Sequence, residues 1–92
     1  MDSTVFDNRA QQRFELAVGD AIAAAYYRLE DDRVVLVHTE VPQEFSGRGI
    51  GSRLAEGVFQ SLRDSGRMVV TECPFMAAWA GRHPEYADLV IG

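Results

Sequence analysis

The chain has 92 residues, of which 47% are hydrophobic and 25% charged, and this size and composition indicate one small globular domain rather than a disordered, fibrous or two-domain protein. All nine basic residues are Arg and the formal net charge is −5, so the sequence lacks the basic field of a nucleic-acid-binding protein. A single Cys excludes an internal disulfide and favours a reducing, cytoplasmic location, while no apolar stretch approaches the roughly 20 residues of a membrane span.

The first half of the chain predicts a β-meander. Residues 1–12 are polar and lack a period, which suggests a mobile lead-in before a single domain over 13–92. Strand periodicity then runs from Phe14 to Val18, and a Gly-Asp turn leads into an extended run that ends at Leu29. A β-branched segment, Arg33–Val41, supplies the third strand, which should end or splay at Val41 because Pro42 cannot donate to a ladder.

A helix is predicted from Ile50 onward, because four apolar residues recur at helical spacing: Leu54, Val58, Phe59 and Leu62. Ser46 is a candidate N-cap and Gly66 a candidate C′ residue. Gly57 lies inside the helix, where Gly costs roughly 1 kcal/mol relative to Ala, and so it indicates close packing.

Three shorter elements are predicted after this helix. Met68–Cys73 is a candidate strand parallel to Arg33–Val41 if the helix is a crossover. Pro74 opens a short helix, Phe75–Arg82, and 89–91 is a candidate edge strand. The predicted fold class is therefore α/β, with a mixed, mostly antiparallel sheet, one long crossover helix, a fourth parallel strand and a short C-terminal helix.

The loop between the third strand and the long helix contains alternating glycines at Gly47, Gly49 and Gly51, a pattern typical of an anion-binding cradle. It is not a Walker loop, since the spacing differs and the chain has no Lys. The dinucleotide fingerprint fits poorly, because Ser52 stands where its third glycine should be and a meander precedes the loop. A plain turn joining strand to helix remains a structural alternative.

Glu44-Phe45-Ser46-Gly47-Arg48-Gly49 resembles the loop that binds the pyrophosphate of coenzyme A in the GNAT superfamily of N-acetyltransferases. Further blocks, at 38–42, 47–54, 73–75 and 83–90, resemble the miniature single-domain branch of that superfamily, so the likeness extends from Phe14 to the end of the chain. Glu44 departs from the usual Gln or Arg, and we expect its carboxylate to face solvent.

The resemblance implies an acetyl-CoA-dependent N-acetyltransferase with an unidentified amine acceptor, either a small molecule or a protein, and gives no indication of a metal or an oligomeric state. The pantetheine arm would lie between the strands ending at Val41 and Cys73. Residues expected to bind coenzyme A are Val41, Gly47, Arg48, Gly49, Ile50, Gly51 and Ser52. The main alternative is a noncatalytic module that binds coenzyme A or acyl-CoA and acts through a protein partner; a pure protein-interaction domain is a third.

Three residues are candidates for the chemistry. In a regular strand His38 and Glu40 share a face with Leu36 and could form a base with an orienting carboxylate, or else a hydrogen-bonded histidine beside a solvated strand end. Cys73, at a strand end, could carry the acyl group, donate its thiol proton or merely fill space.

The group that protonates the leaving thiolate is not evident from the sequence. The miniature branch often has Tyr at the position of Trp79, and Trp has no titratable proton. This substitution leaves water, Cys73 or Tyr86 for that step, with Trp79 expected to pack against the cleft or the core.

Overall fold

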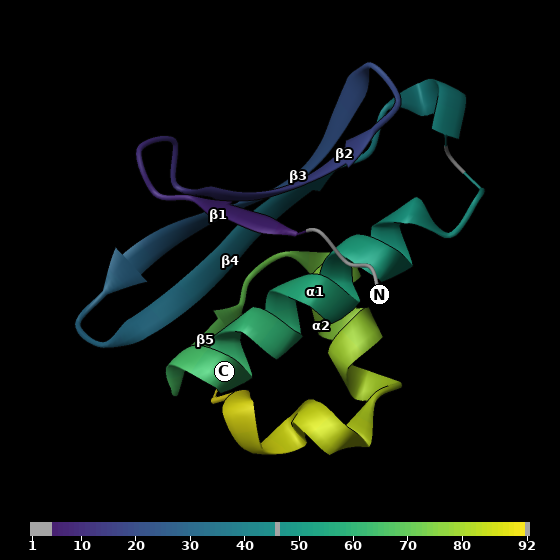
Figure 1. Ribbon diagram of the computed structural model, residues 1–92. Helices are drawn as coiled ribbons and strands as arrows, with labels where there is room; N and C mark the ends of the chain where they lie inside the picture. Colours follow the sequence, from purple (N-terminus) through teal and green to yellow (C-terminus); the bar gives the residue numbers. More distant parts are fainter. Residues whose placement is uncertain (1–4, 46, 92) are drawn as a thin grey trace.

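A computed structural model describes residues 5–45 and 47–91 (Figure 1). The elements in chain order are β1 (Phe6–Asn8), β2 (Arg13–Val18), β3 (Ala21–Glu30), β4 (Arg33–Glu40), the 3-10 helix η1 (Gln43–Phe45), α1 (Ile50–Ser65), β5 (Met68–Thr71), α2 (Pro74–Gly81) and the 3-10 helix η2 (Pro84–Leu89). The strands form one sheet in the order β1-β2-β3-β4-β5. Pairing is antiparallel from β1 to β4 and parallel between β4 and β5, which confirms the predicted α/β fold class and the crossover helix.

Ordered structure begins earlier than the sequence predicted. β1 lies within the supposed lead-in and pairs with β2, with Phe6 opposite Glu15. The buried Tyr27 hydroxyl donates a hydrogen bond to the Asp7 carboxylate at 2.6 Å, and burial together with this bond raises the pKa of Tyr27 to about 12. A lead-in over all of 1–12 is thus wrong for β1, which is short and polar and is specified by tertiary contacts. Residues 1–4 lie outside the described part of the chain.

A β-bulge in β4 changes which side chains face the core. Tyr27 pairs with Leu36 and Tyr26 pairs with His38, so Val37 is an extra residue on β4. Leu36 and Tyr27 belong to the core, whereas His38 lies with Tyr26 on the opposite face and is exposed. The predicted common face for Leu36 and His38 is therefore wrong, because one added residue reverses the alternation of a strand.

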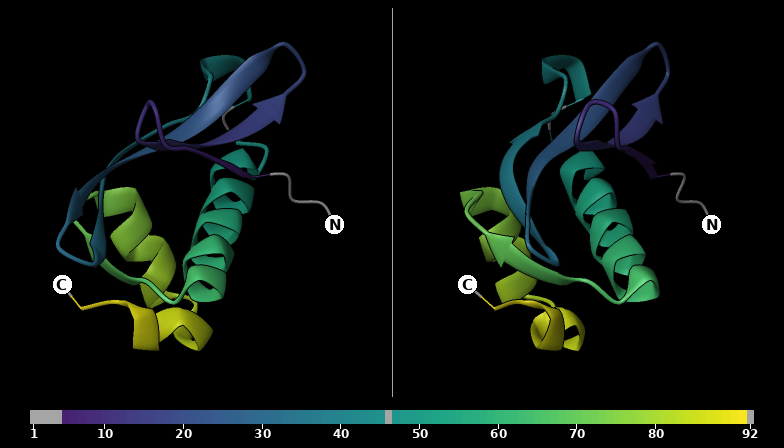
Figure 2. Two further views of the ribbon diagram at one scale, coloured as in Figure 1. Left: turned by 60° about the vertical axis from the view of Figure 1, so that its left-hand side comes forward. Right: turned by 90° about the vertical axis from the view of Figure 1, so that its left-hand side faces the viewer.

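α1 crosses one face of the sheet and buries its predicted apolar stripe against it (Figure 2). Gly66 ends the helix at φ 71°; its N–H donates to the Arg63 carbonyl, and the next N–H donates to the Leu62 carbonyl, which confirms the predicted C-terminal cap. At the other end the N-cap residue is Gly49. Ser46, the predicted N-cap, lies outside the described residues.

The C-terminal segment packs beneath the ends of α1 and α2 (Figure 2). The predicted edge strand at 89–91 is wrong, because η2 extends to Leu89 and only an isolated parallel bridge joins Val90 to Val69. Arg63 of α1 holds η2 in place through the Asp88 carboxylate and the Glu85 carbonyl. Within the ranges 5–45 and 47–91, no helix has both the length and the hydropathy needed to cross a bilayer.

Gly57 provides a test of how the N-terminal segment packs on α1. A Cβ at this position would overlap the Val5 side chain, whereas a Cβ at Gly81, in α2, would meet nothing within 4 Å. We therefore expect Gly57→Ala to lower the free energy of unfolding by about 2 kcal/mol despite the better helix propensity of Ala. Gly81→Ala is the matched control and should be neutral or slightly stabilising in urea unfolding. Equal effects would contradict the packing of residue 5 against α1.

Candidate functional site

The site begins where β4 and β5 separate. Their pairing ends with Leu36 opposite Thr71, and the Leu36 carbonyl then accepts the N–H groups of both Glu72 and Cys73 at 2.9 Å. Among the described residues, Val37 is the unpaired bulge residue and 38–40 pair only with β3. The strands therefore part after Leu36 rather than at Val41 as predicted, because β5 stops at Thr71 and Pro74 starts α2.

Thr39 and Cys73 meet across the inner end of this gap, which is the end nearer the last paired residues, Leu36 and Thr71. The Thr39 Oγ1 and Cys73 Sγ atoms are 3.3 Å apart, and either can be the donor. Cys73 is the N-cap residue of α2, is only 3% exposed and belongs to the core cluster. The bulge at Val37 makes this contact possible, since it brings Thr39 to the α1 side of the sheet.

A cavity of about 290 Å³ lies at the outer end of the gap, between the end of β4 and the first turns of α1 and α2. Its lining residues are Val41, Phe45, Gly47, Gly49, Ile50, Gly51, Ser52 and Phe75. All the predicted coenzyme-binding residues except Arg48 are among them. Phe45 and Phe75 were missed by the sequence reasoning; the available signal was an aromatic residue on each side of the predicted cleft, one before the glycines and one after Pro74.

The glycine loop leaves helix donors available beside this cavity. Gly47 and Gly49 have φ angles of 82° and 75°, a conformation that favours glycine. The Arg53 N–H donates to the Gly49 carbonyl, and among residues 5–45 and 47–91 no side chain caps the helix. The N–H groups of residues 50–52, in the first turn, have no intrahelical partner because no helical residue lies four positions before them. These N–H groups and the helix dipole favour an anion at this end of α1.

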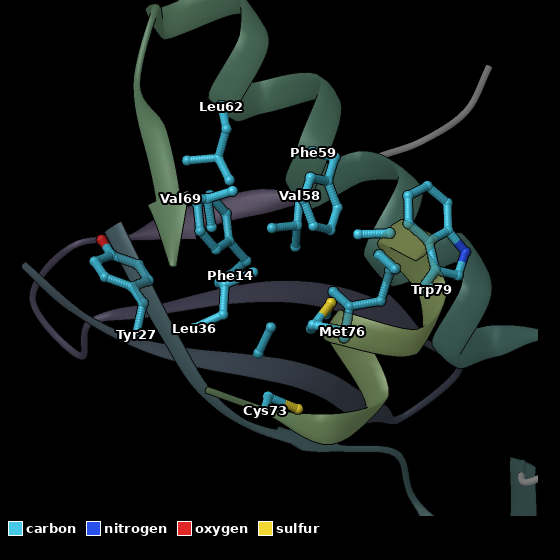
Figure 3. Close-up of a cluster of buried hydrophobic side chains, with 14 of the residues drawn as sticks. Phe14, Tyr27, Leu36, Val58, Phe59, Leu62, Val69, Cys73, Met76 and Trp79 are labelled. Carbon is cyan, nitrogen blue, oxygen red and sulfur yellow. The ribbon is translucent and has the colours of Figure 1, made fainter. Parts of the chain in front are cut away.

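The first turns of α1 and α2 are in close contact. A Cβ at Gly51 would lie 2.9 Å from the Phe75 ring, so the missing side chain permits this approach. One turn along α2, the Trp79 indole N–H donates to Ser52 Oγ at 2.9 Å. Trp79 is 2% exposed and stacks on Phe59, with 5.3 Å between the ring centroids. Figure 3 shows Trp79 and Phe59 in the buried cluster that also contains Cys73, which confirms that Trp79 packs in the core.

The charged residues of the loop differ in position. The Arg48 guanidinium lies 5.9 Å from the centroid of the Phe45 ring, next to the cavity. Glu44 is exposed, as the sequence predicted. In the part of the chain that the structure describes, no three His, Cys, Asp or Glu side chains gather in a way that could hold a metal ion.

His38 and Glu40 form a pair on the opposite face of β4. His38 Nε2 lies 3.2 Å from Glu40 Oε2, and the two side chains are 59% and 60% exposed. Tyr86, the other candidate proton donor, lies elsewhere: its hydroxyl donates to Gln60, and burial raises its pKa. Gln60 is ten residues along α1 from Ile50, which is roughly 15 Å at 1.5 Å per residue. The Tyr86 hydroxyl therefore lies far from the glycine loop, and its contacts with Gln60 and Phe59 hold η2 against α1.

The fold and the site together define a small α/β protein with a split mixed sheet and a glycine-rich loop at the N-terminus of its crossover helix. Residues 13–89 match the family model described as GCN5-related N-acetyl-transferase, and the chain belongs to this family. The solution structure of a GCN5-like protein from Staphylococcus aureus has the same fold: it superposes with a TM-score of 0.72 at 22% sequence identity and covers 99% of this chain and 92% of its own. No curated protein matches the chain.

The Trp79–Ser52 bond leads to a testable expectation. Ser52 is exposed, yet removing its hydroxyl leaves the buried Trp79 N–H without its acceptor. Ser52→Ala should therefore lower the free energy of unfolding by about 1–2 kcal/mol. Ser65→Ala, at the end of the same helix, is the control and should change it by less than about 0.5 kcal/mol. Chemical denaturation of the three proteins measures both, and an equal response would show that the bond does not link the helices.

Proposed function

We propose that this protein transfers an acetyl group from acetyl-CoA to an amine. The observation that carries the proposal is the first turn of α1, which no described side chain caps, together with its glycine loop; both line a cavity at the mouth of the gap between β4 and β5. Membership of the GCN5-related N-acetyltransferase family supports acetyltransferase activity in general. The loop geometry and the parted strands support coenzyme A as the donor's carrier.

The chemistry of the cavity fits the parts of coenzyme A. The diphosphate would be held by the free N–H groups at 50–52, with Arg48 close enough to add a positive charge. Phe45 and Phe75 provide apolar walls for the less polar parts. The edge of β4 that β5 leaves without a strand partner is suited to the amides of the pantetheine arm. When bound, acetyl-CoA supplies an activated acyl carbon as a thioester.

His38 is the proposed base, and its tautomer follows from its partner. A carboxylate can only accept a hydrogen bond, so Glu40 requires the proton of the neutral imidazole on Nε2. The Nδ1 lone pair is then free to take a proton from the acceptor amine. Because both side chains are exposed, an amine can approach them from solvent, and the net charge of −5 favours a cationic acceptor.

Thr39 and Cys73 are the proposed source of the proton for the leaving thiolate. Their side chains meet at the inner end of the gap, and each carries a hydrogen that can be donated. Trp79, whose only proton donor is already bonded to Ser52, is not needed for this step. Because Cys73 is buried, we propose direct transfer to the amine rather than transfer through an acylated cysteine.

The anion cradle is tested by a charge change at Gly49. Asp and Asn both tolerate the left-handed conformation of this residue, but Asp places a carboxylate at the mouth of the cavity. Coenzyme A at 100 times its dissociation constant should stabilise the native protein by about 2.7 kcal/mol. We expect Gly49→Asn to retain most of this stabilisation and Gly49→Asp to lose it, as measured by thermal unfolding with and without coenzyme A. No stabilisation of the native protein would remove the proposal.

The base is tested by turnover. His38→Ala should lower kcat by about 10²- to 10⁴-fold, and Glu40→Gln should lower it by less. Neither change should affect the binding of coenzyme A. Thiol release from acetyl-CoA in the presence of a panel of amines measures the first effect, and calorimetry measures the second. Full activity in both variants would refute this assignment of the base. Binding by the native protein with no turnover for any amine would instead indicate a coenzyme A-binding module.

A further inference from the structure

A row of cross-strand partners connects the proposed base to the N-terminal hairpin. On the exposed face of the sheet Arg13 of β2 pairs with Tyr26 of β3, which pairs with His38 of β4. The Arg13 guanidinium donates to the Tyr26 hydroxyl at 3.1 Å. The rings of Tyr26 and His38 stack, with centroids 6.0 Å apart and planes 24° from parallel. Three strands thus contribute to the surroundings of one imidazole.

A second row lies next to the first and fixes both of its ends. Glu15 of β2 pairs with Ala24 of β3, which pairs with Glu40 of β4. The Glu15 carboxylate forms an ion pair with Arg13, and Glu40 forms one with His38 when that ring is protonated. Each end of the first row therefore contacts a carboxylate of the second row. The residue between the two carboxylates, Ala24, is small and leaves the Tyr26 ring the only large side chain on β3 within these two rows.

Tyr26 matters because β4 is supported on one side only at this point. Beyond the bulge, the described residues of β4 pair with β3 and have no strand on the side of the gap. The His38 side chain is more than half exposed, so packing in the core does not fix its rotamer. Within the described part of the chain, the ring of Tyr26 and the carboxylate of Glu40 both contact the imidazole.

We propose that Tyr26 is a positioning residue, which holds the His38 ring with Nε2 directed at Glu40 and Nδ1 free. Its catalytic consequence rests on the proposed function, but the placement of the ring does not. A merely structural role for Tyr26, as a cross-strand contact that stabilises the sheet, would leave the tautomer of His38 unchanged. The tautomer is therefore the readout that separates the two roles.

The experiment compares the native chain with Tyr26→Leu and Tyr26→Phe. Leu keeps an apolar side chain but removes the stacked ring, whereas Phe keeps the ring and removes only the hydroxyl that Arg13 contacts. Arg28→Gln is the matched control: Arg28 lies on the same strand and face, pairs with Glu30 and Glu72, and does not contact His38. Thermal unfolding establishes that each variant is folded before it is compared.

The ¹⁵N spectrum of the neutral His38 ring reports its tautomer. The native chain, Tyr26→Phe and Arg28→Gln should show mainly the form protonated on Nε2, and Tyr26→Leu should show a mixture of the two forms. Turnover should follow the same order, with kcat about tenfold lower in Tyr26→Leu and the KM for acetyl-CoA unchanged.

The outcomes for the two proposals can be told apart. An unchanged tautomer in a folded Tyr26→Leu would overturn the positioning role, whatever the kinetics show, and so would an equal disturbance in Arg28→Gln. If the native protein has no turnover, the proposed function fails, while a tautomer change confined to Tyr26→Leu still supports the positioning of His38. Should Tyr26→Leu fail to fold, Tyr26→Val removes the ring with a residue suited to a strand and is judged by the same criterion: a mixture of tautomers supports positioning, and an unchanged tautomer overturns it. Loss of the preferred tautomer in Tyr26→Phe, which keeps the ring, would contradict stacking as the cause.

Discussion

The double acceptance of N–H groups by the Leu36 carbonyl is the constraint on which the site depends. It takes the place of continued strand pairing, because the N–H groups of Glu72 and Cys73 converge on one acceptor and the chain then turns into α2. Without this early departure of β5, the ladder would continue along β4 and no gap would exist. The cavity, the free edge of β4 and the approach of α2 to α1 all follow from it.

The gap needs walls that hold their separation, and these walls are continuous with the core. Gly51 lets the Phe75 ring approach α1. One turn further on, Trp79 donates to Ser52, and its rings stack on both Phe59 and His83. The loop that faces the cavity is thus connected through Ser52 to the most buried aromatic cluster. In this chain the Trp79 side chain therefore supports the geometry of the loop, because its one side-chain donor bonds to Ser52 and its rings lie in the core.

Features that depend on near neighbours in sequence could be predicted. The apolar stripe of α1, its end at Gly66 and the glycine loop follow from helical periodicity and backbone conformation, and the structure agrees with each. The likeness of the loop to a phosphate-binding loop could also be recognised in the sequence, because that pattern consists only of alternating glycines between a strand and a helix.

Features set by tertiary contacts could not be read from the sequence. β1 is polar and three residues long, and it is held by pairing with β2 and by the bond between Asp7 and the buried Tyr27. The bulge at Val37 has no signature in the β-branched run around it, because register depends on which residues of β3 lie opposite. Because the bulge was not predicted, His38 was assigned from the sequence to the wrong face of the sheet.

The bulge also explains how one strand can serve both sides of the gap. In a regular strand His38 and Glu40 would lie with Leu36 on the α1 face, and two ionisable groups would have to be desolvated there. The extra residue turns both outward and at the same time brings Thr39 inward to Cys73. On the proposed function, the thiol carrier would occupy the α1 side of the gap, and the amine would approach from the exposed side. On that proposal, the single inserted residue would keep the two substrates on opposite sides of β4 while His38, Thr39 and Glu40 remain within two positions of one another.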